Sequence, residues 1–187
     1  MIGYAFCGSF CTHEASLSVL AELLARGWPI TPIFSETAYE TDTKFGCAED
    51  ITKKVTAMCG RDIVHTIPVA ERFGPTAPLD ALIIAPCTGN TLAKLSHGIT
   101  DTAVCMSAKA HLRQNRPLLI ALASNDAMSA NLENIARLLN RKSIFFVPMR
   151  QDDPDKKPHS LVADFSMVIP AYEAMLQGKQ LRPLFLS

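Results

Sequence analysis

One apolar run constrains the fold more than any other part of the sequence. Residues 81–85 read Ala-Leu-Ile-Ile-Ala, and Pro86 follows them directly. Such a run, ended by a turn signal, is typical of a strand that helices cover on both faces of a parallel sheet. A helix pattern begins again at the polar turn 87–91. Because ligands of open parallel sheets bind beyond the carboxyl ends of the strands, this turn predicts a ligand site; Thr88 and Asn90 as simple helix caps are the alternative.

The rest of the chain alternates between strand and helix patterns. We expect further strands at residues 2–7, 29–34, 63–69, 117–123 and 143–147. Helices are expected from residue 12 or 13 to 26, over 51–59, in one or two segments up to residue 113, over 131–140 and over 161–177. Strands that alternate with helices form βαβ units and a parallel sheet, so the sequence predicts an α/β protein. A chain of 187 residues is long enough for one domain over 1–187.

Composition excludes some partners. Hydrophobic residues make up 48% and charged residues 19%, and 18 basic residues balance 18 acidic ones. A net charge of zero argues against binding to nucleic acid or to a membrane surface. Since monomers seldom leave large apolar patches in water, so few charges also predict subunit contacts.

The cysteines and the start of the chain bear on location. Neither metal-ligand spacing nor a small disulfide framework connects the six cysteines, so we expect reduced thiols and no metal site. No charged leader precedes a long apolar segment, and no apolar run reaches about 18 residues. The sequence therefore predicts a cytoplasmic protein.

Residues 150–160 differ in character from the segments around them. They carry Asp and Lys residues and no apolar residue except prolines, so they form a charged loop or lid, followed by a C-terminal helix and tail over 161–187. As a lid, this loop would bring Lys156, Lys157 and His159 to an anionic substrate. A plain solvated loop is the alternative.

Small polar turns follow four of the expected strands. Gly8 and Ser9 follow the first strand, Ser35 the second, and residues 87–91 and 124–126 two later ones. In a doubly wound sheet these turns meet at one edge, where glycine, hydroxyl groups and helix N-termini suit a phosphate. Neither a GxGxxG nor a GxxxxGK[ST] motif is present, which favours a mononucleotide with one phosphate.

The same turns carry a resemblance to a known family. Residues 86–91, Pro-Cys-Thr-Gly-Asn-Thr, resemble the Pro-Ala-Ser-Ala-Asn-Thr signature of the flavoprotein family that contains the homo-oligomeric flavin-containing cysteine decarboxylases. Residues 93–95 and 98–101 follow its pattern, and 123–128 resemble its Pro-x-Met-Asn-x-x-Met motif.

The resemblance implies a three-layer Rossmann-like fold with a six-stranded, mainly parallel sheet, FMN at its carboxyl edge, and assembly into trimers or multiples of them. Asn125 is implied as the residue that contacts substrate, and Cys87 is a second catalytic candidate beside the expected flavin ring. The residues expected to bind the cofactor are Gly8, Ser9, Ser35, Pro86, Cys87, Thr88, Gly89, Asn90, Thr91, Ser107 and Met128.

A closer resemblance within the family rests on residues 85–90, 124–127 and 146–148, with Gln151-Asp152 and 156–158. It implies a subunit that works with a second subunit, which has a dehydrogenase-like fold and is expected to bind NADP. Together they would oxidise a small cyclic dicarboxylate during sporulation.

Two further functions stay open. A flavin-dependent decarboxylase of a cysteine-containing substrate would need a catalytic His shortly before the central strand, but His65 lies further upstream of Asp80 and no Cys clamp is visible. A non-catalytic partner that activates the second subunit is the other alternative. Where flavin prenyltransferases have an Arg, this chain has Met106. His13 and His97 fit helix ends, and His111 fits a helix surface.

Overall fold

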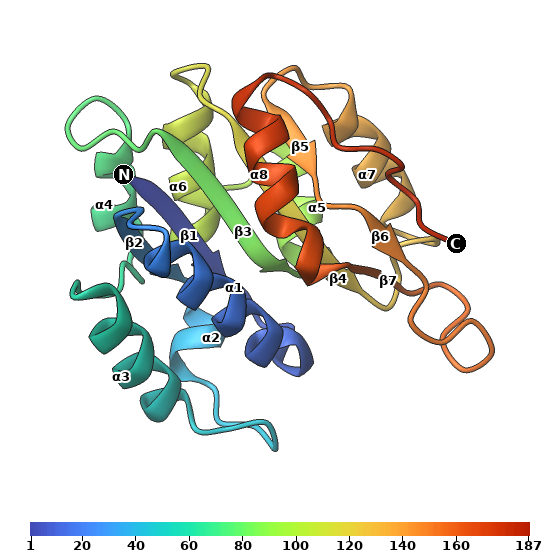
Figure 1. The fold of residues 1–187 in the computed structure, drawn as a ribbon, viewed down its shortest axis with the longest axis horizontal. Coiled ribbons are helices and arrows are strands. Elements are labelled where there is room, and N and C mark those ends of the chain that lie inside the picture. Colours follow the sequence, from blue (N-terminus) through green and yellow to red (C-terminus); the bar gives the residue numbers. More distant parts are fainter.

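The computed structural model describes residues 1–187 and is built on one twisted sheet (Figure 1). Five parallel strands pair in the order β2-β1-β3-β4-β5. Their bounds are β1 Ile2–Phe6, β2 Ile30–Phe34, β3 Ala81–Cys87, β4 Leu118–Ser124 and β5 Ile144–Phe146. β1 and β3 are buried at every position, as expected of strands that helices cover on both faces.

Helices lie on both faces of this sheet and form three layers with it (Figure 1). One face packs on α1 (His13–Ala25), α3 (Ala48–Cys59) and α8 (Val168–Leu176). The other face packs on α5 (Gly89–His97), α6 (Ala103–Leu112) and α7 (Leu132–Leu139). The short helices are α2 Glu36–Glu40, α4 Ile67–Ala70, and the 3-10 turns Phe10–Thr12, Glu71–Phe73 and Phe165–Met167.

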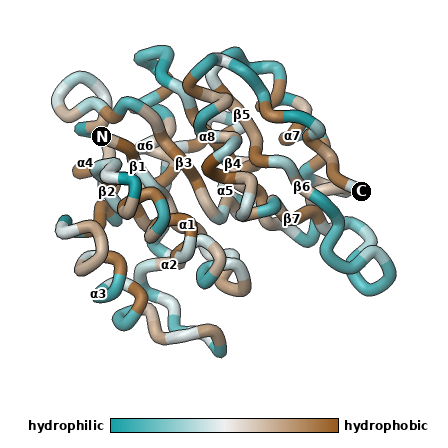
Figure 2. The backbone as a smooth tube through the Cα atoms, in the orientation of Figure 1, coloured by the Kyte–Doolittle hydropathy of each residue, from teal (hydrophilic) through white to brown (hydrophobic).

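Each strand supplies side chains to both layers, so there are two cores. Ile2, Tyr4 and Phe6 of β1 belong to one cluster of 24 buried residues, and Ala5 belongs to the opposite cluster of 27. Figure 2 shows the sheet as the most hydrophobic part of the backbone, with polar residues in the outer loops. None of the helices has the length and apolar character that a membrane span requires.

The strand order places a crevice between β1 and β3. From β1 the chain crosses to β2 on one side, and β3 then adds to the other side of β1. The connections after β1 and β3 therefore leave in opposite directions, and the carboxyl ends of these two strands flank the point where doubly wound sheets bind ligands.

Two short antiparallel strands extend the sheet beside the carboxyl half of β4. β7 (Leu161–Ala163) pairs with Ala123 and Ser124 of β4, and β6 (Met149–Arg150) pairs with β7. The C-terminal tail then runs beside β6, because Met149 N donates to Leu184 O (2.9 Å) and Leu186 N donates to Met149 O (2.8 Å). Residues 151–160 are the loop between these strands, and they project from the body of the protein (Figure 1).

The Rossmann-like three-layer arrangement confirms the expected fold class, while three details differ. The sheet has seven strands where six were expected. In the expected strand 63–69, only Val64 bridges Ile33, and Pro68 lies in the first turn of α4, where its missing N–H costs nothing. The expected helix 161–177 begins only at Val168, because 161–163 pair with β4.

Candidate functional site

Three helix N-termini meet at one polar hollow above β1 and β3. The hollow has a volume of about 420 Å³, and no hydrophobic side chain lines it. Its walls are the first residues of α2, α5 and α6 together with the turn after β1. The lining residues are Gly8, Ser35, Glu36, Thr37, Thr88, Asn90, Thr91, Lys94, Asp101 and Thr102.

Each of the three helices begins with a hydroxyl cap. Ser35 Oγ accepts from Ala38 N (3.2 Å), Thr88 Oγ1 from Thr91 N (3.1 Å), and Thr102 Oγ1 from Cys105 N (3.1 Å). A cap satisfies only one of the N–H groups that a helix leaves free at its start. The others, and the positive ends of the helix dipoles, favour an anion in the hollow.

Gly8 keeps the hollow open on the side of β1. A Cβ atom at this position would lie 3.1 Å from Thr37 Cγ2, so a larger side chain would fill the space between the turn after β1 and the start of α2. The backbone of Gly8 can therefore approach a phosphate closely. The donors and the space fit the phosphate end of a mononucleotide.

The acidic side chains in the hollow already have partners. Lys94 Nζ lies 2.8 Å from Asp101 Oδ1, and this partner lowers the pKa of Asp101. Glu36 Oε1 accepts from Ala103 N (3.1 Å) at the start of α6. The field that a bound anion experiences therefore comes from the helix N-termini and Lys94. Five lining residues were not among those predicted to bind the cofactor, although the Thr102 cap was readable from a hydroxyl residue just before a helix. They are Glu36, Thr37, Lys94, Asp101 and Thr102.

The two sequence motifs touch each other at Gly89. Its Cβ would lie 2.6 Å from Asn131 Nδ2 and 2.7 Å from Asp126 Oδ1, so only glycine lets the turn 124–131 pack on the start of α5. Asp126 holds that turn together, because its side chain accepts from Ser124 Oγ and from Asn131 Nδ2 (2.9 Å). These hydrogen bonds lower the pKa of Asp126, which stays a carboxylate.

The structure brings most of the sequence-predicted cofactor residues to this edge. Gly8, Ser35, Thr88, Asn90 and Thr91 line the hollow itself. The others nearby support it: Pro86 and Cys87 lie in β3, Gly89 begins α5, and Ser9 Oγ donates to Ala123 O (2.8 Å), which ties the turn after β1 to β4.

Ser107 does not reach the hollow. Its side chain is completely buried inside α6, where Oγ donates to Ala103 O (2.7 Å). Asn125 and Met128 lie in the neighbouring turn, and the Asn125 side chain is exposed. Met128 N donates to His159 O (2.9 Å), so this turn is joined to the charged loop 151–160.

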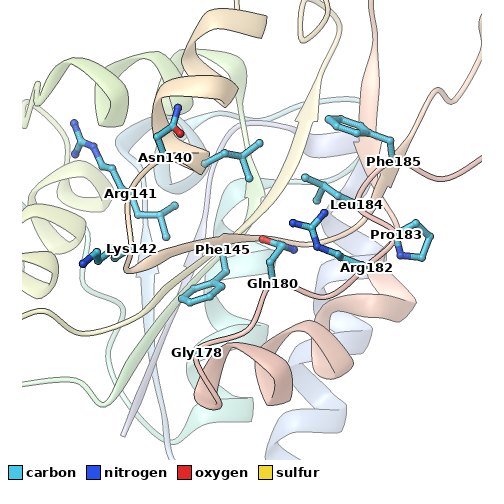
Figure 3. A pocket seen from close by; sticks show the side chains of 12 residues that line it. Asn140, Arg141, Lys142, Phe145, Gly178, Gln180, Arg182, Pro183, Leu184 and Phe185 are labelled. Carbon is cyan, nitrogen blue, oxygen red and sulfur yellow. The ribbon is translucent and has the colours of Figure 1, made fainter.

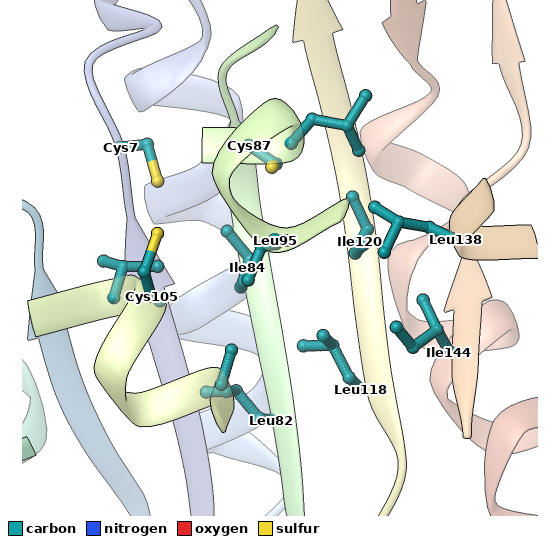
Figure 4. Close-up of a cluster of buried hydrophobic side chains, with 14 of the residues drawn as sticks. Cys7, Leu82, Ile84, Cys87, Leu95, Cys105, Leu118, Ile120, Leu138 and Ile144 are labelled. Atoms are coloured by element: carbon teal, nitrogen blue, oxygen red, sulfur yellow. The ribbon is translucent and has the colours of Figure 1, made fainter. Parts of the chain in front are cut away.

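Three buried thiols lie beneath the hollow (Figure 4). Burial raises the pKa of Cys87 well above its ordinary value and that of Cys7 to about 12, and Thr91 Oγ1 donates to Cys7 Sγ (3.4 Å). Cys105 is the third thiol, and its pKa is also raised by burial. A nucleophilic thiol needs an electropositive, accessible setting, so this environment speaks against Cys87 as a nucleophile.

Lys156 and Lys157 lie in the exposed loop and are paired within it. Lys157 Nζ is 2.6 Å from Asp152 Oδ2, and Lys156 Nζ is 3.9 Å from Asp153 Oδ2. Both cations remain open to solvent, so a doubly charged substrate could exchange with their exposed partners at little cost.

The histidines have structural partners. His65 stacks on the Tyr39 ring with 3.8 Å between ring centroids. His13 Nε2 lies 2.7 Å from Cys7 O, and His97 Nδ1 lies 2.9 Å from Ala93 O. His111 is completely buried on α6 with Nε2 2.9 Å from Pro117 O, so the expected helix-surface position is wrong. No group of three or more metal-ligating side chains is arranged to hold a metal ion.

Comparison with known proteins places the chain in a family. Residues 2–169 match the family model described as Flavoprotein, and the chain belongs to this family. It is 40% identical over 186 residues to the B subunit of dipicolinate synthase from Bacillus subtilis (strain 168), with 100% of this chain and 93% of that protein covered.

Solved structures give the same result. The crystal structure of the dipicolinate synthase B subunit from Bacillus halodurans C matches with a TM-score of 0.91 and 39% identity, covering 100% of this chain and 95% of that one. The FMN-dependent cysteine decarboxylase SpaF shares the fold with a TM-score of 0.69 and 22% identity, covering 95% of each chain.

Proposed function

We propose that this protein binds FMN, with the phosphate in the hollow between the starts of α2, α5 and α6. The observation that carries the proposal is the convergence of three capped helix N-termini on one hollow beside Gly8. Such a site holds a phosphate by backbone N–H groups and hydroxyls. Ser35 and Thr88 would each donate a hydroxyl hydrogen to it while still accepting from their helices.

The flavin ring needs a different surface. The hollow has no hydrophobic lining, so it suits the phosphate and the ribityl chain, whereas a flat ring needs apolar contacts. We propose that a second copy of the chain supplies them in a homo-oligomer, a trimer or a multiple of it. Exposed Ile99 and Leu132, which are 48% and 50% accessible, are apolar residues that such contacts would cover.

The full-length identity supports a more specific role. We propose that the chain is the FMN-binding B subunit of dipicolinate synthase and acts with an A subunit that binds NADP. The pair would oxidise a dihydrodipicolinate-type precursor to dipicolinate during sporulation. The 40% identity over 100% of this chain supports this assignment.

The turn 124–131 and the loop 151–160 supply the proposed substrate contacts. Asn125 would hydrogen-bond the substrate, and Lys156 and Lys157 would face its two carboxylates. Met128 N, bonded to His159 O, keeps these two segments together. Bound FMN would supply an acceptor for two electrons. The residues of this chain bind and orient the substrate, and none of them is placed as a nucleophile.

Reconstitution tests the proposal. The chain is combined with an A subunit, with and without FMN, and dipicolinate formation is measured. We expect formation only when both subunits and FMN are present. Equal formation without FMN would instead favour a non-catalytic partner, and release of CO₂ from a peptide with a C-terminal cysteine would favour a decarboxylase.

A further inference from the structure

The largest hollow of the molecule lies far from the flavin edge, at the amino end of β5. Its volume is about 1080 Å³. One wall is the end of α7 with the residues that lead into β5, and the other wall is the C-terminal tail (Figure 3). We define the basic groove as its lining: Leu139, Asn140, Arg141, Lys142, Ile144, Phe145, Gly178, Gln180, Arg182, Pro183, Leu184 and Phe185.

The charge of the basic groove is entirely of one sign. Arg141, Lys142 and Arg182 line it, and no acidic residue does. None of the three makes a salt bridge in the structure, whereas Arg26, Arg137 and Arg150 on other surfaces each pair with a carboxylate. The whole chain has a net charge of zero, so this concentration of three positive charges is local.

The positive charges surround apolar surface. Figure 3 shows Arg141 and Lys142 on one side, and Arg182 with Leu184 and Phe185 on the other. Phe185 is 55% exposed, a large fraction for an aromatic side chain. Arg and Phe are enriched at the centres of protein interfaces, whereas Asp and Glu, absent here, are depleted there.

The edge of β5 beneath the groove is already closed. Gln180 Oε1 accepts from Phe146 N (2.9 Å), and Gln180 Nε2 donates to Phe146 O (2.7 Å), so a side chain replaces a neighbouring strand. An occupant therefore cannot add a strand at Phe146 and would be recognised by its side chains.

We infer that the basic groove docks an acidic segment of the partner subunit, whose carboxylates pair with Arg141, Lys142 and Arg182 and whose apolar residue covers Phe185. This inference rests on the proposed function, which supplies that subunit. Docking here leaves the phosphate hollow free, because the groove lies at the amino end of β5 and the hollow lies at the carboxyl ends of β1 and β3.

The test compares two triple variants with the same change in net charge. Arg141→Glu/Lys142→Glu/Arg182→Glu reverses the basic groove. Lys54→Glu/Arg61→Glu/Arg72→Glu reverses three exposed cations of α3, of the residue pair after it, and of the turn after α4. Affinity for the purified A subunit is measured by isothermal titration calorimetry at low and high salt, with FMN binding and thermal unfolding as checks.

The groove variant is expected to bind its partner about a hundredfold more weakly and to lose most of the salt dependence, since paired charges across an interface are screened by salt. The control variant is expected to stay within about threefold of wild type. Equal affinity of both variants would overturn the docking inference, as would a changed oligomer mass with unaltered affinity for the A subunit. If the wild-type chain shows no affinity for the A subunit, the proposed two-subunit function fails instead.

Discussion

Gly89 and Asp126 join the two motifs of the candidate site into one unit. A Cβ on Gly89 would lie 2.7 Å from Asp126 Oδ1, so the start of α5 and the turn 124–131 approach more closely than any side chain at position 89 would allow. The residues that bind the proposed phosphate and the residue proposed to contact substrate are therefore held in a fixed relation.

The contact predicts a measurable coupling. Gly89→Ala is expected to destabilise the protein by about 1–3 kcal/mol, because the added methyl group must displace Asp126 and Asn131. Asp126→Ala frees that turn to move, so the double variant should be more stable than the sum of the two single losses by at least about 0.5 kcal/mol. Urea denaturation measures all four proteins. The pair Gly89→Ala and Lys53→Ala, on opposite sides of the sheet, serves as the additive control, and additivity in the first cycle would contradict the contact.

Thiol accessibility should follow burial. Cys11 is exposed and is expected to react first with iodoacetamide in the native protein. Cys59 should react more slowly, since partial burial raises its pKa to about 11. Cys7, Cys87 and Cys105 should react only after unfolding. Peptide mapping by mass spectrometry gives the order, and fast labelling of Cys87 in the folded protein would restore it as a candidate nucleophile.

Two buried histidines predict a loss of stability in weak acid. Burial lowers the pKa of His13 and of His111, so each is neutral in the folded protein and takes up a proton more readily when unfolded. As the pH falls below the unfolded value of about 6.5, each histidine should reduce the free energy of unfolding, by at most about 1.4 kcal/mol per pH unit. His111→Gln keeps an N–H donor for Pro117 O and should remove part of this slope between pH 7 and 5. An unchanged slope in His111→Gln and in a matching His13 variant would exclude these groups as the cause.

The charged loop predicts an effect on substrate alone. Lys156→Ala combined with Lys157→Ala should raise the Michaelis constant of the reconstituted enzyme about tenfold, or about 1.4 kcal/mol, since two cations facing a dicarboxylate are lost. FMN affinity and affinity for the A subunit should not change. Steady-state rates with the A subunit in saturating excess check this, and an unchanged Michaelis constant would leave 151–160 as a solvated loop.

Much of the fold was predictable because its signals are local. The run 81–85 and the polar turn after it predicted the central strand and the edge where the hollow lies. The strand 161–163 was not predictable, because its apolar residues continue into a helical pattern and only their pairing with Ala123 and Ser124 makes them a strand. Burial of His111 likewise depends on how α6 packs on its neighbours.

The candidate site divides in the same way. Gly8, Ser35 and Thr88 were predictable because each follows the carboxyl end of a parallel strand. Thr102 and Asp101 follow a helix, and their place in the hollow depends on how the chain turns back after α5. Ser107 was expected at the cofactor, but the helix turns its hydroxyl inward onto Ala103 O.

Titration of the cofactor-free chain with FMN tests the central claim most directly. Flavin fluorescence is followed in wild type, Gly8→Val, Ser35→Ala and, as a control on the inward-facing hydroxyl, Ser107→Ala. We expect tight binding by wild type and Ser107→Ala, about tenfold or more weaker binding by Ser35→Ala through loss of a charge-assisted hydrogen bond, and the greatest loss in Gly8→Val. Wild-type affinity in both Gly8→Val and Ser35→Ala would contradict a phosphate site between the three helix N-termini.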